Sequence, residues 1–302
     1  MTHRRPRFTL LDALILLALL AGAVFVFHRI RDGLNYRWEW GAIPQYLFRS
    51  DPGYERWVPN VLMQGFFTTI RLSIWATLLA TLIGTVMGLL RVSRYRFRRW
   101  LGLLYVELTR NTPPLVLVFI FYYFIGEQLL PTMGLEAAIR LQPPETQSLL
   151  AALLAPAGLL TAFLSAVVAL SIFEGAYITE IVRAGIQSID MGQREAAAAL
   201  GFTRWQSMRH VILPLAVQRI LPPLGGQFIS TIKDSAIVSV ISIPELTFRG
   251  MELMSATYLT FETWITISGL YFILTFGCSL GFARLERAAR KNELRVMSRS
   301  DE

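Results

Sequence analysis

Long apolar segments without charged residues constrain this chain more than any other feature of its sequence. Residues 263–283 contain no Asp, Glu, Lys or Arg, and neither do residues 72–90. A helix needs about 20 apolar residues to cross the roughly 30 Å hydrocarbon core of a bilayer. The sequence therefore predicts an all-α integral membrane protein with six transmembrane helices, at positions 8–27, 72–90, 113–125, 159–183, 215–243 and 263–283.

The composition excludes several other classes of protein. Hydrophobic residues make up 54% of the chain and charged residues only 17%, with a net charge of +8, whereas soluble domains carry about 25% charged residues. The single Cys278 excludes an intramolecular disulfide, and the three histidines are scattered, so no metal site and no cofactor are expected. The positive charge is typical of cytoplasmic loops, and no nucleic-acid partner is expected.

The distribution of Arg and Lys predicts the orientation in the membrane. Most of the 29 basic residues fall on segments that share one side with the N-terminus, including residues 91–99 and 284–299. Because cytoplasmic loops carry an excess of Lys and Arg, we expect both termini in the cytoplasm.

The first apolar segment has two interpretations. Arginines at positions 4, 5 and 7, followed by an apolar stretch and Ala21-Gly22-Ala23, are typical of a cleaved signal peptide. The apolar run, however, continues to Phe27 and reaches a full membrane length, which favours an uncleaved anchor.

Two local patterns predict helix contacts. Ala80, Gly84 and Gly88 repeat at four-residue spacing, which lets two helices approach closely, and packing within the chain is favoured over a dimer contact. Glu107 and Arg110 stand three residues apart and are expected to pair on one helix face.

The segment 186–214, between the fourth and fifth predicted spans, has the pattern of two short helices joined by a sharp turn. Gly201 suits the left-handed residue that ends a helix, with Leu200 and Phe202 forming an apolar tip. Two pairs have capping-box spacing, namely Asp190 with Gln193 and Thr203 with Gln206. Such a hairpin could dock on a soluble partner, lie in the membrane interface or, least favoured, bind DNA; we favour docking.

The same segment resembles the EAA loop of ABC-transporter permeases. It has Glu195-Ala196-Ala197, then Gly201, then Val211-Ile212-Leu213-Pro214 at the family's spacing, with Val211 in place of the usual Ile. Further segments resemble the polar-amino-acid permeases, namely residues 65–73, 110–116, 180–188, 227–235 and 238–246. The resemblance covers about residues 60–287. Gly226 and Ala236 depart from the family's usual Asn and Ser.

This resemblance implies a five-helix type I importer core with an additional N-terminal helix, in the bacterial inner membrane. It implies three domains: residues 1–59 as anchor and extracytoplasmic segment, 60–287 as the permease domain, and 288–302 as a cytoplasmic tail. It also implies ABC ATPase subunits, a second permease chain (identical or different), an extracytoplasmic amino-acid-binding protein and a polar amino acid as substrate. The implied ATPase-coupling residues are Glu195, Ala196, Ala197, Leu200, Gly201, Phe202 and Pro214.

ATP chemistry is expected on another chain, and no catalytic residue is expected in this one. A Walker A loop needs Gly-Lys followed by Ser or Thr. The two lysines, Lys233 and Lys291, are followed by Asp234 and Asn292.

Charged residues in or near the predicted spans are candidates for the substrate path, because charges facing lipid are costly. These residues are Glu174, Lys233, Asp234 and Arg71. Glu174 could meet a substrate ammonium group or pair with an internal cation, namely Arg71, Arg110 or Lys233. Lys233 and Asp234 follow the interruptions Pro222-Pro223 and Gly225-Gly226 and could contact substrate or pair with each other. Arg71 could instead extend its side chain to the membrane surface.

Two alternative functions remain at this stage. An ion-gradient-driven secondary transporter would use Glu174 and Asp234 as ion sites, but no inverted repeat of the kind usual in such folds is visible. A membrane-bound enzyme would need a cluster of His, Cys or paired carboxylates, which the sequence lacks.

Overall fold

The computed structural model describes residues 9–33, 36–51 and 56–300, and nearly all of them are helical. The chain divides into two units, Met1–Gly41 and Ala42–Glu302. In the first unit α1 (Leu10–Gly33) forms one apolar helix. Thr9 caps its start, since the Thr9 hydroxyl accepts from the Asp12 backbone N–H at 3.3 Å, and the Thr9 backbone N–H donates in return to Asp12 Oδ2 at 2.8 Å. A 3₁₀ turn, η1 (Trp40–Ala42), spans the boundary between the two units in the sequence.

The second unit is organised around α3 (Val61–Arg91) and α8 (Leu160–Gln187). A Cβ atom on Gly84 would lie against Ile178, and one on Gly88 would lie against Val182. Because later residues of α3 meet later residues of α8, the two helices run parallel. The small residues of α3 therefore pack within the chain, as their spacing predicted.

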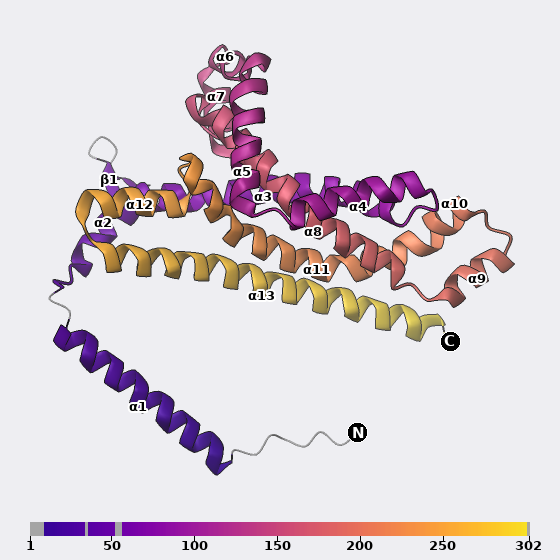
Figure 1. Ribbon diagram of the computed structural model, residues 1–302, viewed down its shortest axis with the longest axis horizontal. Coiled ribbons are helices and arrows are strands. Elements are labelled where there is room, and N and C mark those ends of the chain that lie inside the picture. The colour runs from indigo at the N-terminus through magenta and orange to yellow at the C-terminus, as the bar shows by residue number, and fades with distance from the viewer. Residues whose placement is uncertain (1–8, 34–35, 52–55, 301–302) are drawn as a thin grey trace. The chain divides into compact units, whose positions relative to one another are not determined.

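Three further long helices complete this group (Figure 1); two of them pack against α8, and the third packs against one of these two. They are α4 (Arg96–Arg110), α11 (Leu213–Asp234) and α13 (Thr260–Ser300). Gly185 of α8 contacts Ile220 of α11, and Gly225 of α11 contacts Phe282 of α13. The expected interruption of α11 at Pro222-Pro223 is wrong, because the helix runs through both prolines. Packing on α8 before the prolines and on α13 after them holds both halves of the helix in place.

The regular helix of α11 ends at Asp234 instead. It continues as a 3₁₀ segment, η6 (Ser235–Ile241), and Ser242 adopts a left-handed conformation with φ 58°.

The segment between α4 and α8 leaves the group of long helices (Figure 1). It contains α5 (Pro114–Phe121), a π-helical stretch η2 (Tyr122–Leu129), η3 (Pro131–Met133), α6 (Leu135–Arg140), α7 (Pro144–Leu153) and η4 (Ala157–Leu159). Arg71 of α3 donates to the carbonyl of Ala151, and the Trp75 indole donates to the carbonyl of Leu153 at 2.9 Å. These bonds satisfy carbonyls at the C-terminal end of α7, which have no partner within that helix.

The end of this unit opposite α9 (Met191–Ala199) and α10 (Arg204–Ser207) is formed by short elements (Figure 1). These are α2 (Ile43–Leu47), the antiparallel strands β1 (Phe48–Asp51) and β2 (Arg56–Pro59), and α12 (Leu246–Thr257). The buried Glu245 carboxylate caps α12 by accepting from the N–H groups of Thr247 and Phe248. It also accepts from the Tyr271 hydroxyl at 2.9 Å, so one side chain joins α12 to α13.

Four segments of the described chain are long and apolar enough to cross a membrane. They are Val61–Arg91, Pro114–Met133, Pro144–Gln187 and Thr260–Arg287, with Leu10–Phe25 as a shorter apolar helix. The protein is therefore a largely helical multi-pass membrane protein. The expected count of six is not reached on this criterion, because α11, with Gln218, Arg219 and two prolines in its interior, is less apolar than these four segments, and the apolar part of α1 is shorter.

Candidate functional site

A helical hairpin connects α8 to α11 and forms the first candidate site. It consists of α9 (Met191–Ala199), α10 (Arg204–Ser207) and a π-helical turn, η5 (Met208–Ile212). Gly201 has φ +77°, the left-handed conformation that its position predicted. The Phe202 N–H donates to Ala197 O and the Gly201 N–H donates to Ala198 O, which together make a Schellman motif. The turn that ends α9 is thus fixed by backbone bonds that require a left-handed residue at 201.

One of the two predicted capping boxes is present. The Gln206 backbone N–H donates to the Thr203 hydroxyl, and the Thr203 N–H donates to the Gln206 side chain at 2.8 Å. The box predicted for Asp190 is wrong, because its side chain makes no capping hydrogen bond to α9. The Asp190 carboxylate instead lies 3.8 Å from the guanidinium of Arg219 on α11.

Two arginines attach the hairpin to the long helices. Arg194 of α9 donates to Ile186 O at 2.9 Å, near the C-terminal end of α8. Arg219 of α11 donates to Ser188 O and also faces Asp190. The start of α9 is therefore joined to both α8 and α11.

The outer surface of the hairpin is apolar and exposed. The Leu200 side chain is 75% exposed and Trp205 is 69% exposed, while Met191 and Phe202 are also exposed. Phe202 packs edge-on against His210. Trp205 was not singled out in the sequence, although its place within the hairpin was known; its exposure depends on the direction in which the short α10 leaves Thr203.

The predicted coupling residues take two different positions. Ala197 is buried beneath the hairpin, whereas Glu195, Ala196, Leu200 and Gly201 are exposed on it. Pro214 lies in the first turn of α11, directly after the π-helical turn η5.

The second candidate site is a buried polar cluster between α8 and α11. Glu174 of α8 is fully buried, and the Gln227 side chain donates a hydrogen bond to its Oε2. The other carboxylate oxygen, Oε1, has no protein partner. Thr231 and Asp234 also neighbour the Glu174 carboxyl. Gln227, Thr231 and Asp234 stand four and three residues apart, so they share the face of α11 that meets Glu174.

The internal cations do not pair with Glu174. Arg71 binds the carbonyl of Ala151, and the Arg110 guanidinium lies 5.1 Å from the centre of the Tyr177 ring. Lys233 is exposed, and the ion pairs of the described residues do not join it to Asp234.

The expected pair of Glu107 and Arg110 is also absent from these residues. Glu107 instead accepts from the Asn111 amide at 2.8 Å. Arg110 is drawn to the ring of Tyr177, whose face attracts a cation.

Sequence reasoning missed two polar contacts. Gln227 was part of a recognised segment but was given no role, and its spacing to Thr231 and Asp234 was the available signal. Glu180 pairs with Arg91 of α3 at 2.5 Å and with Arg183 at 2.7 Å, which links the ends of α3 and α8.

No group of three or more His, Cys, Asp or Glu side chains that could hold a metal ion occurs in the described part of the chain.

Comparison with known proteins now places the chain in a family. Residues 45–290 match the model of the binding-protein-dependent transport system inner membrane component. The chain belongs to this family. Its relatives include the probable glutamine ABC transporter permease protein GlnM of Bacillus subtilis, with 34% identity over 77% of this chain and 95% of the relative. The glutamate/aspartate import permease protein GltJ of Escherichia coli is 33% identical over 85% of this chain and 97% of the relative.

Solved structures agree with the family. An amino acid ABC transporter crystallised with histidines superposes with a TM-score of 0.61 and 34% identity, covering 76% of this chain and 94% of the other. The MetNI methionine ABC transporter superposes with a TM-score of 0.56 at 19% identity, which supports the fold alone. These relatives are transport permeases and not enzymes, and they support an ABC importer subunit over an ion-gradient-driven transporter.

Proposed function

We propose that this chain forms the translocation path of an ATP-driven importer for polar amino acids and transmits the movement of ATPase subunits to that path. The observation that carries the proposal is the attachment of the α9–α10 hairpin to α8 and α11 by Arg194 and Arg219. The same two helices hold Glu174 and Gln227. A force on the hairpin would therefore move the two walls of the buried polar cluster.

Docking of an ATPase on the hairpin is supported by its surface. Leu200, Phe202 and Trp205 present apolar area beside a rigid glycine turn, and such area favours a protein partner. The family's use of a binding protein and the amino-acid relatives support an extracytoplasmic amino-acid-binding protein and a second permease chain as further partners.

The buried cluster is our proposed contact for the substrate. A buried carboxylate oxygen without a partner needs a cation, a proton or water. An amino acid's ammonium group would supply that partner at Glu174 Oε1, with Asp234 as a second carboxylate nearby. Lys233 and Arg71 are our proposed contacts for the carboxylate end. Arg71 lines a cavity of about 20 Å³, which is too small for an amino acid, so substrate would reach Arg71 only after the segments around this cavity move.

We infer six membrane-spanning helices with both termini in the cytoplasm, and α11 is the span added to the apolar ones. Its polar residues Gln227 and Thr231 turn toward α8 instead of lipid, which makes a polar helix compatible with the membrane. We also propose three domains. Residues 1–59 form the N-terminal anchor helix and extracytoplasmic segment, residues 60–287 form the permease domain, and residues 288–302 form a cytoplasmic tail.

The test is uptake by proteoliposomes that contain this chain with its ATPase subunits and binding protein. Labelled glutamine, glutamate and histidine are supplied outside, with ATP or a non-hydrolysable analogue inside. We expect uptake that requires hydrolysable ATP. Uptake driven by a proton or sodium gradient without the ATPase would overturn the proposal.

A further inference from the structure

The start of α4 carries a concentration of cationic and aromatic side chains with no assigned role. The apolar helix α3 ends at Arg91, and α4 begins five residues later, so this region lies at one end of a membrane span. Arginines occupy positions 94, 96, 98 and 99, and the first turn of α4 contains no acidic residue. Helix N-termini carry a partial positive charge, so this arrangement is unfavourable unless an anion compensates it.

Tyr95 occupies two of the four arginines. Arg94 donates a hydrogen bond to the Tyr95 hydroxyl at 2.7 Å, and this bond lowers the pKa of Tyr95. The Arg98 guanidinium lies 4.8 Å from the centre of the same ring. Arg96 and Arg99 take part in none of the ion pairs formed by the described residues. Two guanidinium groups therefore remain available for an anion.

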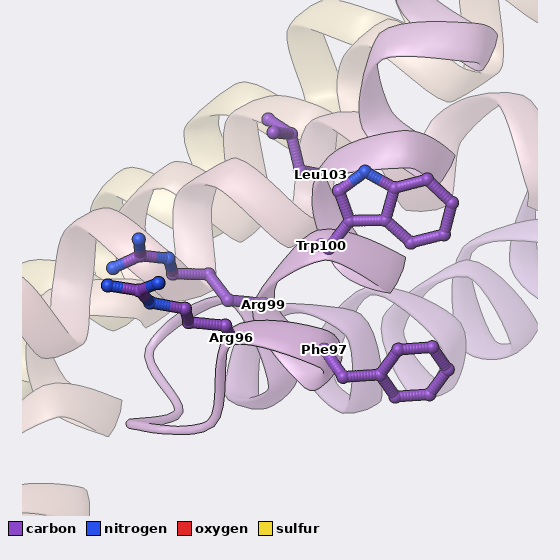
Figure 2. Close-up of a pocket in the computed structure, with 5 residues that line it drawn as sticks. All are labelled: Arg96, Phe97, Arg99, Trp100 and Leu103. Carbon is purple, nitrogen blue, oxygen red and sulfur yellow. The ribbon is translucent and has the colours of Figure 1, made fainter.

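Arg96 and Arg99 line a pocket of about 410 Å³ together with Phe97, Trp100 and Leu103. Figure 2 shows both arginine side chains leaving the helix in the same direction, while the rings of Phe97 and Trp100 leave it on another side. Phe97 is 68% exposed and Trp100 is 54% exposed. The pocket thus combines a cationic edge with an apolar, aromatic floor.

We propose that this pocket binds an anionic phospholipid, with the phosphate on Arg96 and Arg99 and acyl chain carbons on Phe97, Trp100 and Leu103. A free phosphate ion would use the arginines alone and would leave the aromatic rings exposed to water. A lipid would contact both the arginines and the aromatic rings, and the pocket lies just beyond the end of the apolar helix α3, where a membrane span would meet the headgroups. Basic pockets and interfacial Trp residues at this depth are typical of lipid contacts.

The experiment uses the assembled permease–ATPase complex in nanodiscs that contain phosphatidylcholine and a photoactivatable phosphatidylglycerol. Labelled peptides are identified by mass spectrometry after irradiation. We expect the label within residues 95–104 of the wild type. Arg96→Gln with Arg99→Gln should reduce this labelling roughly thirtyfold, since each arginine near a membrane contributes about 1 kcal/mol to binding an anionic lipid.

Three controls make the outcome decisive. Arg284→Gln with Arg287→Gln also removes two exposed charges, from the C-terminal half of α13, and should leave the label at α4 unchanged. Phe97→Ala with Trp100→Ala retains both arginines and should still weaken labelling by the long-chain lipid. Excess inorganic phosphate should compete poorly.

Four outcomes would overturn the proposal. The first is attachment of the label outside residues 95–104 in the wild type, a result that does not depend on the folding of any variant. The second is equal labelling of wild type and the Arg96→Gln/Arg99→Gln variant. The third is full competition by inorganic phosphate, which assigns the site to the free ion. The fourth is loss of the ATPase from that variant with unchanged lipid labelling, which assigns the surface to a protein partner.

Discussion

The turn at Gly201 allows a graded test of the hairpin, because its geometry separates backbone strain from side-chain size. Gly201 has φ +77°, and a Cβ atom added there would meet nothing within 4 Å. A substitution is therefore disfavoured by the left-handed conformation and not by a clash. The hydrogen bonds from Phe202 to Ala197 and from Gly201 to Ala198 are the ones that strain would weaken.

The expected magnitude follows from these contacts. An L-residue in the left-handed region costs about 1–2 kcal/mol, and a β-branched residue costs more. Asn tolerates this conformation better than Ala although it is larger. Since α9 and α10 are short and largely exposed, a loss of 1–2 kcal/mol would lower the population of the native turn by about 5- to 30-fold where the turn is only marginally stable. Function should fall in the order Gly, Asn, Ala, Val.

The assay compares substrate-stimulated ATP hydrolysis and uptake for Gly201→Asn, Gly201→Ala and Gly201→Val in proteoliposomes. Gly192→Ala is the matched control, because Gly192 lies inside α9 and its Cβ would also meet nothing within 4 Å. It should be neutral or slightly stabilising. If Ala is tolerated better than Asn, side-chain size at a contact surface determines the effect, and the strain argument is refuted.

Three further predictions follow from named contacts. Glu174→Gln retains an oxygen that can accept a hydrogen bond from Gln227, so we expect normal assembly with substrate affinity about ten- to hundredfold weaker. Thermal unfolding and uptake are measured on one preparation, and an unstable protein would support a structural role for Glu174 instead. Arg219→Ala removes the contacts to Ser188 and Asp190, so ATP hydrolysis should continue without its stimulation by substrate; intact stimulation would exclude this arginine from coupling. A reporter fused after Tyr95 should lie in the cytoplasm, because residues 91–99 are rich in arginine; an extracytoplasmic signal would reverse the proposed topology.

Local patterns in the sequence predicted much of the hairpin and of the central helix pair. The left-handed turn at Gly201 and the capping box of Thr203 depend on residues near in sequence, and the local spacing of Gly84 and Gly88 predicted a close helix contact without identifying its partner α8. Local backbone and side-chain chemistry fixes such features. The capping box predicted for Asp190 with Gln193 does not form, although α9 begins directly after Asp190, because the Asp190 carboxylate turns to Arg219, a residue on another helix.

The buried cluster shows where local reasoning ends. Glu174 was predicted to be important from its charge and depth, yet its partner is the uncharged Gln227, 53 positions away. No local pattern states which face of α11 meets α8. The passage of α11 through Pro222 and Pro223 has the same origin, because tertiary packing on both sides overrides the local helix-breaking tendency. Contacts between distant segments therefore determine both the partner of Glu174 and the course of α11 through its two prolines.

Site-directed crosslinking tests the central proposal, docking of an ATPase on the α9–α10 hairpin, most directly. Cys278 is the single cysteine of the chain, so Cys278→Ser provides a background for single-cysteine variants. Leu200→Cys is compared with Leu141→Cys, which is also strongly exposed but lies between α6 and α7. The account predicts a crosslink to the ATPase subunit from position 200 and none from position 141. A crosslink from 141 with none from 200 would contradict it.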